Sequence, residues 1–445
     1  MKKYLGLLLA VALLLAMMIP AVSGADYKEF HSLNLGGIVG KAIEEIPKEQ
    51  ARQDKLDPDK KDAIGRMPLE TEIAIEKFLN KDGYTFVTDD WGWAEPLVQK
   101  QVAAFVAKDS EVNIFVGETQ QPGFAMKGYY EPFPAALAAK IRKNVVPAAW
   151  KPMEYKGKIY GVAGLPGVNA FYWNKDLFKK AGLDPEKPPK TWNQILEYAE
   201  KIDKAGNGQF YGGGVYMGPN YGGSLRYTPF VLMLGGGYVD SKGYPTLDKA
   251  ANVTAFEYLR KLSKHLPPGI AAAPSEGAFW DAMNQQRFAM LIDGPWRVAE
   301  GARAGLDFGV STIPLPDKGG KAANVTIGAS FAAVPKYAKY KDEAFKLIEF
   351  ITMDKGFQTL QASTGQRPSV LASVSEDPAY LAKYPFMKAI FDAEKGNVQG
   401  LPTFAKNDVK VWDVLNRAVS KIVITNQPVK DILKQAQKEA MALMK

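Results

Sequence analysis

Residues 84–116 read YTFVTDDWGWAEPLVQKQVAAFVAKDSEVNIFV. Residues 84–88 are rich in β-branched and aromatic side chains, which predicts a strand. Apolar residues then recur with helical spacing over 97–106 and become nearly continuous over 112–116. A strand, a helix and a second strand in about 30 residues is the spacing typical of an α/β protein. This stretch therefore predicts the α/β fold class.

The alternation of strands and helices continues on both sides of this stretch. Further strands are expected near residues 30–35, 157–161 and 170–173, and helices over 73–79, over 192–202 with Thr191 as its N-cap, and over 252–264, 280–288, 341–352, 378–394 and 407–440. No long linker divides the chain into halves. We therefore expect it to cross several times between two lobes.

The composition excludes several classes of function. The 445 residues include no cysteine and two histidines, which argues against disulfide scaffolds, cysteine nucleophiles and histidine-rich metal sites. The formal net charge is +8, but no Lys/Arg stripe is present, so nucleic acid is not an expected partner. Neither GxxxxGK[ST] nor a strand-borne GxGxxG occurs. We expect no metal and no cofactor.

The first residues are typical of a targeting segment. Lys2 and Lys3 precede an uncharged run over 5–19, and small residues follow Pro20. This pattern predicts a signal peptide over 1–24, with an uncleaved anchor as the alternative. Since there is no cysteine to carry a lipid, we expect an exported periplasmic protein and not a lipoprotein. The charge-dense residues 40–66 are interpreted as a surface insertion.

Polar and aromatic residues gather after several predicted strands. An exposed indole loses apolar contact with the core unless a ligand covers it, and the C–H face of a sugar ring covers it well. The candidates are Asp90, Trp91, Trp93, Glu118, Thr119, Gln120, Tyr221, Trp296 and Arg297. Any single tryptophan could equally anchor its loop to the core. Asp90 and Glu118 could also form the carboxylate pair of a glycosidase.

Five segments, taken in order, carry a resemblance to a known family. They are residues 155–161 (YKGKIYG), 173–183 (WNKDLFKKAGL), 189–192 (PKTW), 288–296 (FAMLIDGPW) and 365–369 (GQRPS). The sequence from about Glu70 to its C-terminus resembles the extracellular solute-binding proteins of sugar ABC transporters, the maltose-binding-protein-like group. Gly167 stands where the maltose binder has a carboxylate, so the resemblance does not extend to maltose itself.

The resemblance implies a two-lobed periplasmic-binding-protein fold of the class II type. Each lobe would be a sheet flanked by helices, with the ligand cleft between the lobes. The N-terminal lobe would hold residues 25–165 and 325–370, including the insertion 40–66, and the C-terminal lobe 166–324 and 371–445. By position it also implies ligand contacts from Trp91, Glu118, Thr119, Gln120, Tyr221, Trp296, Ser330, Arg367 and Trp412.

The sequence thus predicts a periplasmic carbohydrate-binding component of an ABC importer, without enzymatic activity. It would capture a sugar, from mono- to oligosaccharide, by hinge closure and deliver it to the transmembrane permease subunits as a monomer. One alternative is a polyol or polyol phosphate, with Arg297 and Arg367 as phosphate clamps. A second alternative is a secreted glycosidase.

Overall fold

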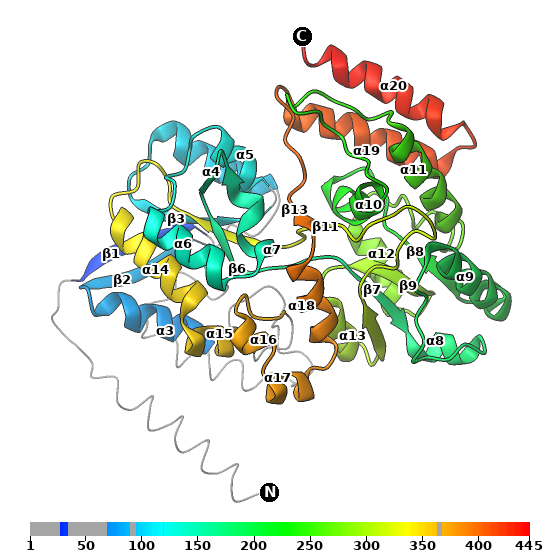
Figure 1. Ribbon diagram of the computed structural model, residues 1–445, viewed down its shortest axis with the longest axis horizontal. Helices are drawn as coiled ribbons and strands as arrows, with labels where there is room; N and C mark the ends of the chain where they lie inside the picture. Colours follow the sequence, from blue (N-terminus) through cyan, green and yellow to red (C-terminus); the bar gives the residue numbers. More distant parts are fainter. Residues whose placement is uncertain (1–26, 34–68, 90–94, 119, 363–366) are drawn as a thin grey trace, which may run out of the picture.

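The computed structural model describes residues 27–33, 69–89, 95–118, 120–362 and 367–445. It shows two α/β lobes, each built on its own sheet flanked by helices (Figure 1). The predicted signal peptide and the insertion 40–66 lie outside the described residues. In the described part of the chain, every helix is too short or too polar to cross a membrane.

The first sheet has five strands in the order β2-β1-β3-β12-β6. Its strands are β1 (Lys28–Leu33), β2 (Tyr84–Asp89), β3 (Val112–Gly117), β6 (Val162–Leu165) and β12 (Ser330–Ala333). β1 runs parallel to β2 and β3, whereas β12 runs antiparallel to β3 and β6. The elements around it are α3 (Leu69–Asn80), α4 (Glu95–Ala107), α5 (Gln121–Met126), α6 (Ala135–Asn144), α7 (Pro147–Trp150), the 3₁₀ turn η3 (Lys151–Met153), the hairpin β4 (Glu154–Tyr155) and β5 (Lys158–Ile159), α14 (Lys341–Met353) and α15 (Lys355–Ala362).

Within the described parts of the quoted stretch, β2, α4 and β3 form where the sequence predicts them, and the apolar residues of β3 are buried. Ile114, Phe115 and Val116 are all at most 3% exposed, as expected of a strand covered by helices on both faces. Phe105 of α4 packs edge-on against Phe115, with ring centroids 4.9 Å apart. Glu118, the polar residue that follows β3, is therefore placed where this central strand ends.

The second sheet has four strands in the order β10-β7-β9-β8. Its strands are β7 (Ala170–Asn174), β8 (Tyr211–Gly214), β9 (Phe288–Asp293) and β10 (Phe308–Ser311). The helices of this half are α8 (Lys175–Lys180), α9 (Trp192–Gly206), α10 (Tyr221–Met233), α11 (Ala250–Ser263), α12 (Glu276–Asn284), α13 (Arg297–Arg303), α19 (Asp408–Ile424) and α20 (Val429–Ala442). Thr191 caps α9 as predicted, since its hydroxyl accepts a hydrogen bond from the Gln194 amide at 3.3 Å.

Two neighbouring segments carry the chain between the sheets. Residues 166–169 join β6 to β7, and residues 326–329 join β11 (Asn324–Val325) to β12. We call them the crossing segments. They pair with each other through an antiparallel bridge between Val168 and Thr326 and a 2.9 Å hydrogen bond from the Ile327 amide to the Gly167 carbonyl. A Cβ on Gly167 would lie 2.2 Å from the Ile327 oxygen, so this close approach requires glycine.

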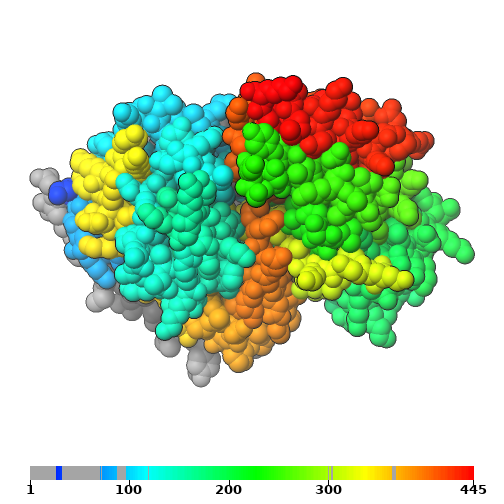
Figure 2. Space-filling view, turned by 45° about the horizontal axis from the view of Figure 1, so that its top comes forward, coloured from blue at the N-terminus to red at the C-terminus, as the bar shows by residue number. Residues whose placement is uncertain are grey.

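A third connection lies between the two halves. It contains α16 (Ala372–Ser375), α17 (Pro378–Lys383), α18 (Met387–Lys395) and β13 (Val398–Gln399), and β13 pairs in parallel with β11. Helix α18 packs against α7 of the first half and against β7 and β10 of the second. In the space-filling view these residues (orange) separate the cyan and green halves (Figure 2).

Three predicted helices differ from the structure. The helix expected over 280–288 ends at Asn284, because Gln286 takes a positive φ of 55° and Phe288 begins β9. The segments 378–394 and 407–440 are each divided into two helices, at Pro385 and Pro428, where proline supplies no amide for a continuing helix. The exact lobe boundaries stay a prediction.

Candidate ligand-binding site

The end of β9 places Trp296 beside the crossing segments. The turn Gly294-Pro295-Trp296 follows the fully buried strand Phe288–Asp293, and the Trp296 ring is only partly buried. A Cβ on Gly294 would lie 2.2 Å from this ring, and a Cβ on Gly328 would lie 2.6 Å from it. The two glycines therefore let the indole lie directly against the backbone of both halves.

Arg367 links this indole to the crossing segments. Its Nη1 donates to the Leu165 carbonyl at 3.1 Å and to the Gly328 carbonyl, and its guanidinium carbon lies 5.4 Å from the Trp296 ring centroid. Cation–π contacts within about 6 Å are attractive. Arg367 thus joins the end of β6, the approach to β12 and the turn after β9 at one point.

A buried charge cluster holds the turn after β9 in place. The Asp293 carboxylate accepts hydrogen bonds from Arg226 Nε at 3.0 Å and Nη2 at 2.6 Å, and from the Gly294 amide at 2.8 Å. Its other oxygen accepts from Trp280 Nε1 at 3.1 Å and lies 3.0 Å from Arg297 Nε. Both arginines are 1% exposed. Because each buried charge is paired, the cluster can orient Trp296 without an uncompensated charge.

Charged groups of both halves act electrostatically on Glu118. It follows β3, and burial raises the pKa of its carboxyl to about 7. The guanidinium groups of Arg367 and Arg226 lower this pKa, whereas the Glu276 carboxylate raises it further. Since Arg226 and Glu276 belong to α10 and α12 of the second half, Glu118 lies within electrostatic range of both halves. Near neutral pH its carboxyl can accept or donate a hydrogen bond.

A buried amide network supports the turn that carries Glu118. Gln121 Nε2 donates to Gln101 Oε1 at 2.8 Å, and the Tyr130 hydroxyl donates to Gln121. A Cβ on Gly117 would lie 2.0 Å from Gln121 Nε2, so glycine makes room for this amide. The side chains that fix the turn thus come from α4, α5 and the loop after α5.

The structure brings only some of the predicted site residues together. Arg367 lies beside Trp296, and its guanidinium is within electrostatic range of the Glu118 carboxyl. Gln120 is the N-cap residue of α5, and Ser330 begins β12 beside Leu165. Asp90, Trp91, Trp93 and Thr119 lie outside the described residues. Direct contact of any of these residues with a ligand stays a prediction.

Three other predicted residues lie deeper in the second half. Trp412 is 3% exposed, and its Nε1 donates to the Pro402 carbonyl at 3.3 Å. Tyr221 begins α10 and meets Trp412 edge-on, with centroids 5.9 Å apart. Arg297 is held by Asp293 and Glu300 and lies 4.9 Å from the Trp280 ring centroid. Arg297 therefore serves the buried cluster, and we do not include it among the proposed ligand contacts.

The sequence analysis missed Arg226, Glu276, Trp280 and Asp293. One signal was available: Arg226 is the single charge in α10, YGGSLRYTPFVLM, and Asp293 ends the otherwise apolar β9, FAMLID. A lone charge in an apolar element is buried only at high cost unless an opposite charge meets it. The pairing could have been suspected, but the two residues are 67 positions apart and nothing local identifies them as partners.

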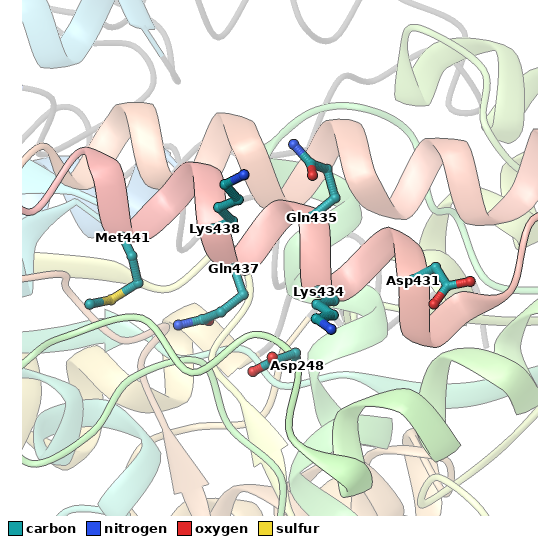
Figure 3. Close-up of a pocket in the computed structure, with 7 residues that line it drawn as sticks. All are labelled: Asp248, Asp431, Lys434, Gln435, Gln437, Lys438 and Met441. Carbon is teal, nitrogen blue, oxygen red and sulfur yellow. The ribbon is translucent and has the colours of Figure 1, made fainter.

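Two other features of the described residues, possible metal-ligand clusters and a surface pocket, do not indicate a different site. They contain no cluster of three or more histidine or carboxylate side chains that could hold a metal ion. A shallow pocket lies between α20 and Asp248 (Figure 3), lined by polar side chains such as Lys434, Gln437 and Lys438. None of the predicted site residues lines it.

The described part of the chain thus consists of two α/β lobes joined by paired crossing segments, with an aromatic side chain between them. Residues 68–356 match the family described as "Bacterial extracellular solute-binding protein", and the chain belongs to this family. The family consists of solute-binding proteins located outside the cytoplasm.

Individual relatives are distant. The chain is similar, at 26% identity over 281 residues, to a probable amino-acid ABC transporter periplasmic-binding protein of Sinorhizobium fredii, with 62% of this chain and 63% of that protein covered. It is also 26% identical over 259 residues to the maltotriose-binding protein of Pyrococcus abyssi, with 57% and 53% covered. The matched region thus spans less than two thirds of either relative.

A solved structure shares the fold. It is an ABC transporter solute-binding protein from Thermotoga lettingae bound with α-D-tagatose, which aligns with a TM-score of 0.68 at 23% identity. The alignment covers 84% of this chain and 96% of that chain.

Proposed function

We propose that this protein binds a carbohydrate between its two lobes and supplies it to an ABC importer. The observation that carries the proposal is the placement of Trp296. Its partly exposed indole is held between the halves by a buried charge cluster and by Arg367, with the Glu118 carboxyl on the opposite half. An apolar ring face opposite a hydrogen-bonding group is what a sugar requires.

The charges around the site favour a neutral ligand over a polyol phosphate. Arg226 is paired with Asp293 and Glu276, and Arg297 with Asp293 and Glu300. The Nη1 atom of Arg367 already donates hydrogen bonds to backbone carbonyls. A phosphate clamp needs guanidinium groups turned toward the ligand, and these are turned toward the protein.

Capture would proceed by rotation of the lobes about the crossing segments. Closure would bring Glu118 and Trp296 onto one ligand, and the closed form would be recognised by the permease. We further propose that the protein is exported by its N-terminal segment, acts as a monomer and has no enzymatic activity. Two similar proteins are named for a sugar, maltotriose in one and tagatose in the other, which supports a sugar as the ligand here. A third is named for an amino-acid transporter.

A thermal-shift screen of the mature protein tests the proposal. The panel contains mono-, di- and oligosaccharides, polyols, polyol phosphates and amino acids. A sugar at 100 times its dissociation constant should add about 2.7 kcal/mol to the free energy of unfolding, which raises Tm by a few degrees. A shift with amino acids alone, or turnover of aryl-glycosides that is lost in Glu118→Gln, would refute the proposal.

A further inference from the structure

Asn169 is a buried amide at the point where the first crossing segment enters the second half. It directly precedes β7 and is 0% exposed. Its Nδ2 donates to the Leu225 carbonyl of α10 at 3.0 Å and to Asn324 Oδ1 at 3.3 Å. Its Oδ1 has no hydrogen-bond partner in the described part of the chain. Because a buried amide with an unpaired oxygen is costly, the bonds of Nδ2 are the reason for an asparagine at this position.

Pro229 explains why the Leu225 carbonyl can accept from a side chain. It lies inside α10, four positions after Leu225, and proline has no amide hydrogen. In a regular α-helix the carbonyl of residue 225 would accept from the amide of residue 229. That donor is missing here, and Asn169 Nδ2 supplies one from another element. The proline and the asparagine therefore complement each other, although they are far apart in the sequence.

A second asparagine ties the other crossing segment to the same point. Asn324 Nδ2 donates to the Asn169 carbonyl at 2.8 Å, so the bonding between the two asparagines is reciprocal. The Asn324 amide donates to the Asn397 carbonyl at 2.9 Å. The Thr326 amide donates to the Gln399 carbonyl at 3.1 Å. The two crossing segments are thus fixed to each other, to α10 and to the third connection.

Helix α10 connects this anchor to the candidate site. Arg226, the residue after Leu225, donates to the Asp293 carboxylate at 3.0 and 2.6 Å. Asp293 ends β9 just before the turn that carries Trp296. One helix therefore holds both the crossing segments and the support of the indole.

The glycines of the crossing segments lie on the first-half side of these asparagines. Gly328 has a positive φ of 57°, and Gly167 lies so close to the Ile327 oxygen that a Cβ would be 2.2 Å from it. Glycine adopts a wider range of backbone angles than other residues. A change in backbone angles between the lobes is therefore easiest at these two positions.

We propose that Asn169 is a positioning residue that fastens the crossing segments to α10 through the carbonyl that Pro229 leaves without a helix amide. The segments then move with the second half. The pivot of lobe rotation lies at Gly167 and Gly328, the latter beside the Trp296 ring. The anchor itself does not depend on a ligand, and only its consequence for capture rests on the proposed function.

Hydrogen–deuterium exchange of the ligand-free protein tests the anchor. Peptides covering residues 160–170 and 322–332 report the opening of the crossing segments, where the Ile327 amide bonds the Gly167 carbonyl. A peptide covering residues 221–234 reports on α10. Urea unfolding of the same variants measures the global stability separately.

A double-mutant cycle isolates the bond between Asn169 and α10. Asn169→Leu removes the donor at similar volume and should raise the opening of the crossing segments about tenfold, because a buried hydrogen bond is lost. Pro229→Ala offers the Leu225 carbonyl a helix amide. In that background Asn169→Leu should raise the opening by no more than about threefold, and it should lower the stability less than it does alone.

Pro229→Ala by itself should raise the exchange of the crossing segments. The new helix amide competes with Asn169 for the Leu225 carbonyl, so the anchor weakens while α10 gains a bond of its own. The α10 peptide should therefore become more protected and the crossing-segment peptides less protected. A change in helix propensity alone would protect α10 and leave the crossing segments as they were.

Asn113→Leu is the matched control. Asn113 is also 0% exposed, and its Nδ2 also donates to a backbone carbonyl, that of Glu111, at 2.7 Å. It lies on β3 in the first half, away from α10. This substitution should lower the stability by the same amount with and without Pro229→Ala, and it should leave the exchange of the crossing segments unchanged.

Each outcome decides the proposal. It is overturned if Asn169→Leu raises the opening equally with and without Pro229→Ala, because the proline would then play no part. It is also overturned if Asn169→Leu lowers the stability as Asn113→Leu does, without changing the exchange of the crossing segments. Should Asn169→Leu fail to fold, Pro229→Ala alone decides, and unchanged or slower exchange of the crossing segments overturns the proposal. Failure of the sugar screen would refute the proposed function and leave these measurements intact.

Discussion

The guanidinium carbon of Arg367 lies 5.4 Å from the ring centroid of Trp296, although Trp296 comes after β9 and Arg367 after α15, 71 positions apart (367 − 296). The same guanidinium donates to the carbonyls of Pro166 and Gly328, one on each crossing segment. The aromatic group proposed to hold the ligand is therefore attached to the segments about which the lobes would move. In the proposed function, ligand contact and lobe movement would therefore depend on the same group of residues.

Replacing Trp296 with alanine should lower sugar affinity at least tenfold while the fold is kept. Losing the apolar face of the indole from a buried contact should cost about 1.5 kcal/mol or more, and a factor of ten corresponds to about 1.4 kcal/mol. Titration calorimetry with the sugar identified by the screen measures the loss. Trp150→Ala is the control, since Trp150 also lies beside an arginine, Arg142, but in the first half. Equal affinities in the two variants would remove Trp296 from the site.

Gly328→Ala should impair binding, and Gly319→Ala should not. Both glycines have positive φ, +57° and +71°, so each alanine strains the backbone by about 1 kcal/mol. At Gly319 nothing lies within 4 Å of the new Cβ, whereas at Gly328 it would lie 2.6 Å from the Trp296 ring and 3.3 Å from Arg367 Nη2. Urea unfolding should show at least as large a loss of stability in Gly328→Ala as in Gly319→Ala, and calorimetry should show a loss of affinity only in Gly328→Ala. Unchanged affinity in Gly328→Ala would contradict the described position of the ring.

Asp293→Asn should destabilise the protein by about 3 kcal/mol, because it leaves Arg226 and Arg297 buried without their shared counter-charge. Both arginines are 1% exposed, so water cannot replace the lost partner. Asp413→Asn breaks the exposed pair with Arg417, whose Nε lies 3.0 Å from the carboxylate, and should cost less than about 0.5 kcal/mol. Urea unfolding at constant pH compares the two variants. Similar losses would show that the Asp293 cluster is not a stabilising unit.

The stability of the ligand-free protein should depend on pH through Glu118. Its pKa is raised from 4.5 to about 7, so the folded state holds the proton more tightly than the unfolded state does. The contribution is therefore fully present below about pH 4.5, decreases as pH rises toward 7 and is lost above it. The difference in unfolding free energy between wild type and Glu118→Gln, measured from pH 4.5 to 8, isolates this carboxyl. A difference that stays constant over that range would contradict the shift.

The local sequence was sufficient to predict a helix or strand wherever residues within that element, by their periodicity or as a cap, determine it. The alternation over 84–116 predicted β2, α4 and β3, and the Thr191 cap predicted the start of α9. The divisions near Pro385 and Pro428 were missed because helical periodicity continues across them, although the missing amide interrupts the helix. The candidate site was predicted in part: Trp296 and Glu118 were recognisable as polar and aromatic residues at the ends of predicted strands.

By itself, the sequence determined the α/β class and the resemblance to solute-binding proteins, and it supplied the candidate site residues. Only the tertiary structure showed that Arg297 is held in a buried cluster with Asp293 and that Arg367 bonds both crossing segments. The reason is physical. Periodicity and capping depend on neighbours a few residues apart, whereas the pairing of buried charges depends on which distant elements the packed core brings together.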